Sequence, residues 1–343
     1  MSITKYRTEI AAAAVVALVF VFAAFSFQDG KTAPPKCLGV DMLAEMSERA
    51  PAAYKTVMDE AGALPNSEAV LWKIEKPGVD PSYLLGTMHL SDPRIARLSP
   101  ATKDAIGHST SVALEVADLS DKAVAEAMAK ASALLVYSDG TKLDTRLSPE
   151  EFKKVQQVVS KSGLPDSAST LMKPWLVSML MATSDCERKQ VASGAKVLDL
   201  LVGAEAERRG IKVVGLETIQ DQLGAMASIP DDEQVAMLKV GLQYIDRSND
   251  LMETLVQMYL NRKISAAMPF QIALAAEHGT PASAFDGFQK ALLVDRNARM
   301  AEAALPLLDK GKAFIGIGAL HLSGPKGLVA LLREQGFTVT AVE

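Results

Sequence analysis

The chain has 343 residues, of which 49% are hydrophobic, so it is long enough to bury a large core as one big domain or two coupled ones. Its 36 Lys and Arg residues nearly balance 41 Asp and Glu residues, which leaves a formal net charge of -5. Because no basic surface is available to gather phosphates, we expect no nucleic-acid partner.

The N-terminus has the pattern of an export signal. Lys5 and Arg7 precede an apolar stretch from Ile10 to Phe27, long enough for a signal-peptide core and at the lower limit for a membrane-spanning helix. No small-x-small cleavage site stands out before Gln28, and Cys37 is not preceded by the leucine of a lipoprotein signal. Residues 1–28 are therefore a cleaved signal peptide or a retained signal anchor, followed by a linker over 29–36. In either case the rest is exported, as a periplasmic protein or one that is bound to the membrane through its N-terminal segment.

Two cysteines, Cys37 and Cys186, fit an exported protein. In an oxidising compartment an isolated pair forms a disulfide more often than a metal site, because a thiolate site would normally show CxxC spacing. We predict a bridge between the segment after the export signal and the helical middle of the chain. The alternative is two unpaired thiols.

After the linker, apolar spacing predicts a helix within residues 40–60, and the period then changes to that of strands. Residues 70–75 and 82–88 flank a turn-rich segment and predict a β-hairpin that ends at His89. Ser99-Pro100 is a good start for a short helix ending by Gly107, and the strand that follows carries Glu115. This β-helix-β crossover predicts parallel strands.

The middle of the chain is predicted to be mainly helical, and strands return near residue 213 and at the C-terminus. Three- and four-residue apolar spacing predicts helices over 123–136, 149–160, 170–183, 197–209, 228–263, 284–308 and 328–334. Strands are predicted over 212–217, 313–320 and 337–342. We therefore expect an α/β fold over residues 37–343, with a central, largely parallel or mixed sheet and a helical cap inserted at about 118–209 and 228–308.

Four of the predicted strands end in side chains that suit catalysis. His89 and His321 each follow an apolar run with a glycine three residues earlier, and Glu115 and Glu217 lie at or near the ends of two further runs. Ligands bind outside the carboxyl ends of strands in open α/β sheets, so these four side chains are expected to share one crevice.

Two histidines with carboxylates describe a divalent-metal site. His89, His321 and Glu115 are the predicted metal ligands, and Glu115 or Glu217 would act as the general base. The alternatives are structural histidines and acids that cap a helix or pair with a cation.

Several other polar residues also have both a functional and a structural interpretation. Arg296 and Asn297 lie on a helix in apolar surroundings, where they would bind substrate or, alternatively, form a surface salt bridge. His108 and His278 are predicted to be exposed beside glycines. The 15 methionines are predicted to fill the core. No Walker loop, H-E-x-x-H or G-x-S-x-G motif is present.

Taken together, several short motifs resemble the TraB/GumN family, which includes pheromone-shutdown proteins and the metazoan TIKI proteins. The matching segments are Leu85-Gly86-Thr87-Met88-His89, Ala113-Leu114-Glu115, Gly215-Leu216-Glu217-Thr218 with Gln222 behind it, Asp295-Arg296-Asn297 and Gly318-Ala319-Leu320-His321-Leu322-x-Gly324. Asp199 falls where relatives carry a Gly-x-Asp, although Val197 replaces the glycine. The resemblance runs from about Cys37 to the C-terminus.

This resemblance implies a fold similar to erythromycin esterase and the haem-binding ChaN proteins. The family is marked by two GxxH motifs and a glutamate, and TIKI members are divalent-metal-dependent peptidases. The implied roles are metal or catalytic residues for His89 and His321, the acid for Glu115, and pocket residues for Glu217, Arg296 and Asn297. We expect a hydrolase of the cell envelope that uses Mn, Co or Zn to cleave a peptide or amide bond. The alternative is a protein that binds a peptide or haem without turnover.

Overall fold

Six strands form one mixed sheet in the protein, here a computed structural model that describes residues 36–343. The order across the sheet is β4-β3-β5-β2-β1-β6. The strands are β1 (Leu71–Lys76), β2 (Val79–Thr87), β3 (Ser111–Leu114), β4 (Lys212–Gly215), β5 (Ala313–Gly318) and β6 (Thr338–Ala341). The predicted α/β fold with a mixed sheet is confirmed. The predicted export signal over 1–28, and the linker up to residue 35, lie outside the described residues.

Four neighbouring strands are parallel, and this arrangement positions the site. β3 pairs with β4 on one side and with β5 on the other, and β5 pairs with β2. Thr87 at the end of β2 lies opposite Gly318 at the end of β5. The crossover from β2 to β3 does not place these two strands side by side, because β5 inserts between them. His321 consequently lies between the strand ends that lead to His89 and Glu115.

The remaining two strands form the antiparallel side of the sheet. β1 and β2 make the predicted hairpin, with Lys76 opposite Val79. Gly78 in the turn has φ 77°, a left-handed conformation that glycine adopts without steric cost. β6 pairs with β1 and closes that edge.

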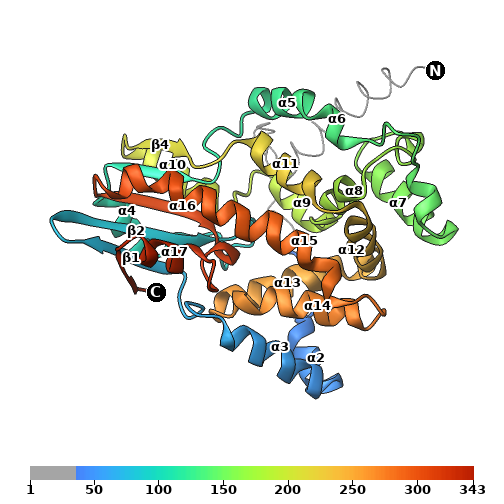
Figure 1. Ribbon diagram of the computed structural model, residues 1–343, viewed down its shortest axis with the longest axis horizontal. Coiled ribbons are helices and arrows are strands. Elements are labelled where there is room, and N and C mark those ends of the chain that lie inside the picture. The colour runs from blue at the N-terminus through green and yellow to red at the C-terminus, as the bar shows by residue number, and fades with distance from the viewer. Residues whose placement is uncertain (1–35) are drawn as a thin grey trace.

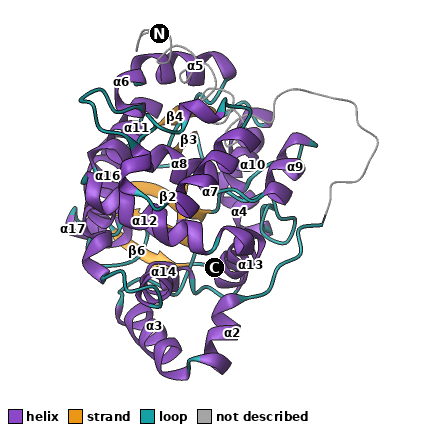
Figure 2. Cartoon of the chain, turned by 90° about the vertical axis from the view of Figure 1, so that its right-hand side faces the viewer, coloured by secondary structure: helices purple, strands orange, loops and turns teal. Residues whose placement is uncertain are grey.

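Both faces of the sheet are covered by helices, as Figures 1 and 2 show. On one face Trp72, Leu84 and Ile315 pack against α16 (Asp295–Leu308) and α17 (Leu328–Glu334). On the other face Leu85, Phe314 and their neighbours pack against α4 (Pro100–Gly107) and α10 (Leu198–Arg208). β5 is a continuous apolar run because both of its faces are buried.

The other helices lie at the top, on the right and at the bottom of Figure 1, and the sheet lies on the left. They are α2 (Met42–Arg49), α3 (Pro51–Ala63), α5 (Asp121–Lys130), α6 (Ser132–Leu135), α7 (Pro149–Lys161), α8 (Pro174–Met181), α9 (Asp185–Ala192), α11 (Ile219–Ser228), α12 (Asp231–Gln243), α13 (Ser248–Leu260), α14 (Ala267–Ala276) and α15 (Asp286–Phe288). Short 3-10 turns join them at Leu143–Arg146, Asp166–Ala168, Ile245–Arg247, Ile264–Ala266 and Ala282–Phe285. Their apolar faces form core clusters separate from the two on the sheet.

Several predicted helices are shorter or more broken than their apolar spacing indicates. The helix expected over 170–183 begins at Pro174, because the residue before a proline favours an extended backbone and proline suits the first helical turn. The helix expected over 123–136 divides into α5 and α6, and that over 228–263 divides into α12 and α13. The helix expected over 284–308 contains a π-helical segment, Gln289–Val294, just before α16.

The predicted disulfide is present. Cys37 and Cys186 are bonded with an S–S distance of 2.06 Å, across 149 residues of sequence. It ties the start of the described chain to α9. Between residues 36 and 343 no helix has the length and apolar character needed to cross a membrane.

Candidate active site

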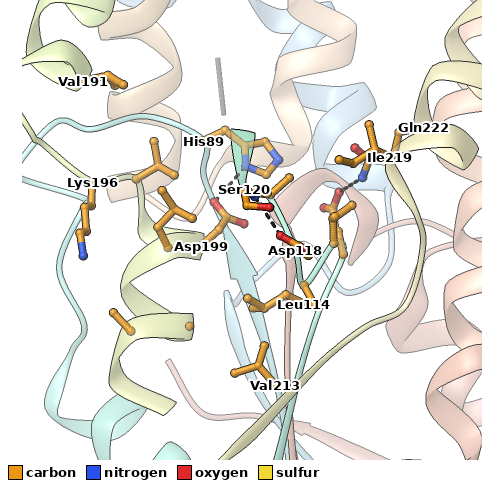
Figure 3. A pocket seen from close by; sticks show the side chains of 18 of the residues that line it. His89, Leu114, Asp118, Ser120, Val191, Lys196, Asp199, Val213, Ile219 and Gln222 are labelled. Atoms are coloured by element: carbon orange, nitrogen blue, oxygen red, sulfur yellow. Dashed lines mark hydrogen bonds and ion pairs between the residues drawn. The ribbon is translucent and has the colours of Figure 1, made fainter. Parts of the chain in front are cut away.

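His89 lies two residues beyond β2 and is held by a carboxylate from α10. Its Nδ1 is 2.9 Å from Asp199 Oδ2 (Figure 3). Thr87 donates a hydrogen bond to the other oxygen of Asp199. The negative charge of Asp199 raises the pKa of His89 to about 9. The His89 side chain is 58% exposed, so its Nε2 is accessible.

His321 lies beyond the neighbouring strand and is held by an amide. Asn297 donates from Nδ2 to the Lys326 carbonyl at 2.8 Å, which turns its Oδ1 toward His321 Nδ1 at 2.6 Å. Nδ1 of His321 is therefore the hydrogen-bond donor, and Nε2 keeps its lone pair. Burial lowers the pKa of His321 to about 4, so the ring is neutral at pH 7.

Glu115 lies between the two imidazoles and accepts three hydrogen bonds. The donors are Gly318 N at 2.7 Å, Gln222 Nε2 at 3.0 Å and Arg296 Nη2 at 2.7 Å. His321 Nε2 is 4.0 Å from Glu115 Oε1. Burial alone would raise the pKa of Glu115, but His321, His89 and Arg296 together hold it down to about 2. The carboxylate is thus ionised at physiological pH.

Glu217 shares Arg296 with Glu115. Arg296 donates from Nε to Glu217 Oε2 at 2.9 Å and from Nη2 to the same oxygen at 2.7 Å. All three residues are buried. Arg299 lies 3.6 Å from Glu217 and is half exposed. Burial works against the charge of Arg296, and its pKa is nevertheless raised by the two carboxylates.

Gly318 marks the point at which the three candidate ligands converge. A Cβ added there would lie 3.1 Å from Glu115 Oε1, 3.5 Å from His321 Cδ2 and 3.7 Å from His89 Nε2. The missing side chain of this glycine therefore leaves the space that the two imidazoles and the carboxylate surround.

A cavity of about 710 Å³ opens beside this cluster. His89, Glu115, Asp199, Gln222 and Arg296 contribute to its wall. Most of the remaining wall is apolar, from side chains that include Leu114, Val197, Leu200, Ile219, Leu223, Met226 and Leu292. His321, Glu217 and Asn297 are buried and do not line the cavity.

The structure brings together the six residues that the sequence predicted for the site. They are His89, Glu115, Glu217 and His321, which follow strands, and Arg296 and Asn297 on α16. Arg296 and Asn297 hold other protein groups, so their predicted contact with substrate stays a prediction, as does the role of Glu217 as a base. His108 and His278 are exposed, as predicted. The contributions of Thr87 and of the Gly318 N–H were not foreseen, and Asp199 and Gln222 were noticed only through the family resemblance.

The donor chemistry fits a divalent ion held by the two histidines. Each Nδ1 is oriented by an oxygen, from Asp199 or Asn297, so Nε2 is the ring nitrogen that could bind a metal ion. His321 is neutral, whereas His89, with a pKa of about 9, must lose its Nε2 proton before it can act as a ligand. Within residues 36–343, no group of three or more His, Cys, Asp and Glu side chains is arranged to hold a metal ion. Glu115 already accepts from three protein donors, so its role as a third ligand stays a prediction.

The fold and site define an α/β protein with a histidine and carboxylate cluster at its parallel strand ends. A model of the TraB/PrgY/gumN family matches residues 70–341, and the chain belongs to this family. No solved structure matches the chain with significance. The predicted similarity to the erythromycin esterase and ChaN fold therefore stays a prediction.

Known relatives include named proteases and an uncharacterised protein. Metalloprotease TIKI2 of Danio rerio is 24% identical over 320 residues, which cover 78% of this chain and 60% of that protein. Metalloprotease TIKI2 of Xenopus tropicalis is 26% identical over 324 residues, covering 80% and 61%. Uncharacterized protein YbaP of Shigella flexneri is 22% identical over 261 residues, covering 76% and 90%. The chain thus spans about 60% of the length of the two TIKI2 relatives.

Proposed function

We propose that this protein is a metal-dependent hydrolase that cleaves a peptide or amide bond outside the cytoplasm. The observation that carries the proposal is the convergence of His89, His321 and Glu115 on the space above Gly318, with each imidazole anchored through Nδ1. The metalloprotease names of the TIKI2 relatives support the same reaction class.

His89 and His321 would hold the ion, with Glu115 as the nearest carboxylate, and Mn, Co and Zn all accept such donors. When bound, a divalent ion lowers the pKa of water and polarises a carbonyl. Asp199 and Asn297 fix the two rings, so the histidines lose little freedom when they bind the ion.

Glu115 is better placed than Glu217 to move a proton during the reaction. Glu115 lines the cavity and is held ionised, whereas the Glu217 side chain is 1% exposed and lies behind Arg296. We therefore assign Glu115 as the general base and Glu217 as the residue that positions Arg296. Arg296 in turn holds Glu115 in the orientation that faces the cavity.

The compartment and the partners follow from the same features. The Cys37–Cys186 disulfide supports an oxidising location, in the periplasm or at the outer side of a membrane. A peptide or another small amide would be the substrate. The N-terminal segment would attach the protein to the membrane if it is retained.

The test is hydrolysis of a fluorogenic peptide library by protein purified without chelator. We expect activity that EDTA abolishes, that Mn, Co or Zn restores, and that His89→Ala and His321→Ala each eliminate. His108→Ala is the matched control, because His108 is exposed and lies before the start of β3, whereas Glu115 follows the end of that strand. Metal bound at about one ion per chain in the wild type and absent from both variants would support the assignment. Full activity in both variants would refute it.

A second candidate is a protein that binds haem or a peptide without turnover. The observation in its favour is the apolar wall of the 710 Å³ cavity with the exposed His89 at its edge. Titration with haem distinguishes the two functions. An absorption band that His89→Ala shifts, together with no metal uptake and no hydrolysis, would replace the hydrolase proposal.

A further inference from the structure

A second cavity lies in the helical half of the molecule. It has a volume of about 420 Å³ and is formed mainly by α8, α12, α13 and α14. Its wall contains no charged residue, and aromatic and aliphatic side chains such as Trp175, Phe270 and Leu274 dominate it. The chemistry of the wall therefore selects an uncharged, apolar occupant.

Methionines form a large part of this wall. Met179, Met181, Met226, Met237 and Met252 all line the cavity and are half-buried. Other methionines, among them Met42, Met46, Met128, Met172, Met258, Met268 and Met300, are fully buried in the core. The five cavity methionines also pack against core clusters, so the predicted role of core filler fits both sets. Unbranched methionine side chains adapt at low cost to ligands of varied shape.

One polar group on the wall has no protein partner. Ser178 Oγ is buried, and among the described residues it is the side-chain atom of this kind without a hydrogen bond. Buried polar groups in a finished core are almost always paired. This oxygen is enclosed by protein atoms, and an alkyl chain could not hydrogen-bond to it, so it does not identify the occupant of the cavity.

The two cavities are neighbours with a shared wall. Met179 of α8 and Met226 of α11 line both of them. Gln222, which hydrogen-bonds to Glu115, lies one helical turn before Met226 on the same face of α11, about 6 Å away along the axis. Met179 and Met226 therefore form part of the wall between the cavity beside Glu115 and the second cavity.

We propose that the substrate is an amide that carries a long alkyl chain. This rests on the proposed function, because it places the amide beside His89 and Glu115. The alkyl chain of the substrate would pass between Met179 and Met226 from the active-site cavity into the second cavity. Burial of successive CH₂ groups against an uncharged wall supplies affinity without any charged contact.

The binding test needs neither metal nor turnover. The full chain is titrated with cis-parinaric acid, a fluorescent C18 fatty acid, which is then displaced by N-acylglycines with chains of 2, 8, 12 and 16 carbons. We expect displacement to strengthen by about fourfold per CH₂ group until the cavity is full. Equal displacement by the C8 and C16 compounds would overturn the proposal.

Gly241 offers the variant that tests where the chain binds. It lies on the wall of the second cavity alone, and a Cβ there would meet only the flexible end of Met181, at 3.1 Å. Gly241→Leu should weaken C16 binding at least tenfold. Gly62→Leu is the matched control, since nothing lies within 4 Å of a Cβ on this helical glycine, and it should leave binding unchanged. Equal binding by the two variants would contradict the location. Ser178→Leu serves if Gly241→Leu fails to fold.

Two further experiments identify the kind of molecule that carries the alkyl chain. They also separate the alkyl-amide proposal from the proposed hydrolase function. Tighter binding of N-palmitoylglycine than of palmitate supports an amide substrate, and equal affinity overturns it in favour of a free fatty acid. Hydrolysis of unacylated peptides without alkyl binding refutes this inference and leaves the hydrolase function standing. Alkyl binding without hydrolysis of any amide refutes the function and leaves only an alkyl-binding site.

Discussion

The ends of β2 and β5 are neighbours in the sheet and carry the same Gly-x-x-His pattern, yet they give their histidines opposite properties. His89 is exposed, rests on the carboxylate of Asp199 and has its pKa raised to about 9. His321 is buried, rests on the amide of Asn297 and has its pKa lowered to about 4. The pattern sets where each imidazole lies, but its charge depends on the surroundings: Asp199 raises the pKa of His89, and burial lowers that of His321.

Glu115 lies between these two strand ends, and Arg296 donates a hydrogen bond to its carboxylate. In Arg296→Met the buried carboxylates of Glu115 and Glu217 lose their common partner. Because an uncompensated buried charge is costly, we expect the free energy of unfolding to fall by about 3–5 kcal/mol. Urea denaturation at pH 7 measures this loss.

Arg299→Met is the matched control for this variant. Arg299 is half exposed and reaches Glu217 only at 3.6 Å, so its loss should change stability by less than about 1 kcal/mol. Similar losses in both variants would mean that the buried cluster does not hold the two strand ends together.

Gly318→Ala tests whether the two histidines act on one shared space. The backbone at Gly318 has φ -52° and ψ 133°, which alanine adopts without strain, so only the new methyl group matters. It would press on Glu115 Oε1 and lie close to both rings. A displacement of about 1 Å should lower kcat/KM for peptide hydrolysis about 100-fold.

The control and the readouts for this variant separate local from global effects. Gly62→Ala, on an open helix surface, should keep full activity. Thermal unfolding of Gly318→Ala should stay within a few degrees of the wild type. Undiminished activity would show that the two histidines do not serve a common centre.

Asp199→Asn makes the partner of His89 resemble that of His321. The amide can still accept from Nδ1, but the charge is lost, so the pKa of His89 should fall while that of His321 stays low. Metal affinity should weaken about 10- to 100-fold, because the orienting partner tunes the ligand. NMR titration of the metal-free protein and metal-binding calorimetry measure the two effects. An unchanged His89 titration would remove Asp199 from this role.

The sequence was sufficient to predict the polar residues at the strand ends, but not the residues from other elements that hold them in place. His89, Glu115, Glu217 and His321 are visible because uniform apolar runs stop at them, and parallel pairing then brings them together. Asp199 lies in the first turn of a helix without such a run, and its contact with His89 depends on how α10 packs across the sheet. No local pattern encodes that packing. The position of β5 between β2 and β3 likewise depends on pairing between distant segments, which no local pattern encodes.

The smallest expected effect is the contribution of the His89–Asp199 pair to stability. The folded pKa of about 9 is above the ordinary value near 6.5, so the pair stabilises the protein fully below about pH 6.5 and loses its effect as the pH rises through 9. His89 is 58% exposed, and solvent screening should keep this contribution below about 1 kcal/mol. The difference in unfolding free energy between wild type and Asp199→Asn, measured in chelator from pH 6 to pH 10, should therefore shrink at the alkaline end. A difference that grows with pH would reverse the assigned charge of His89 and end the contrast between the two strand ends.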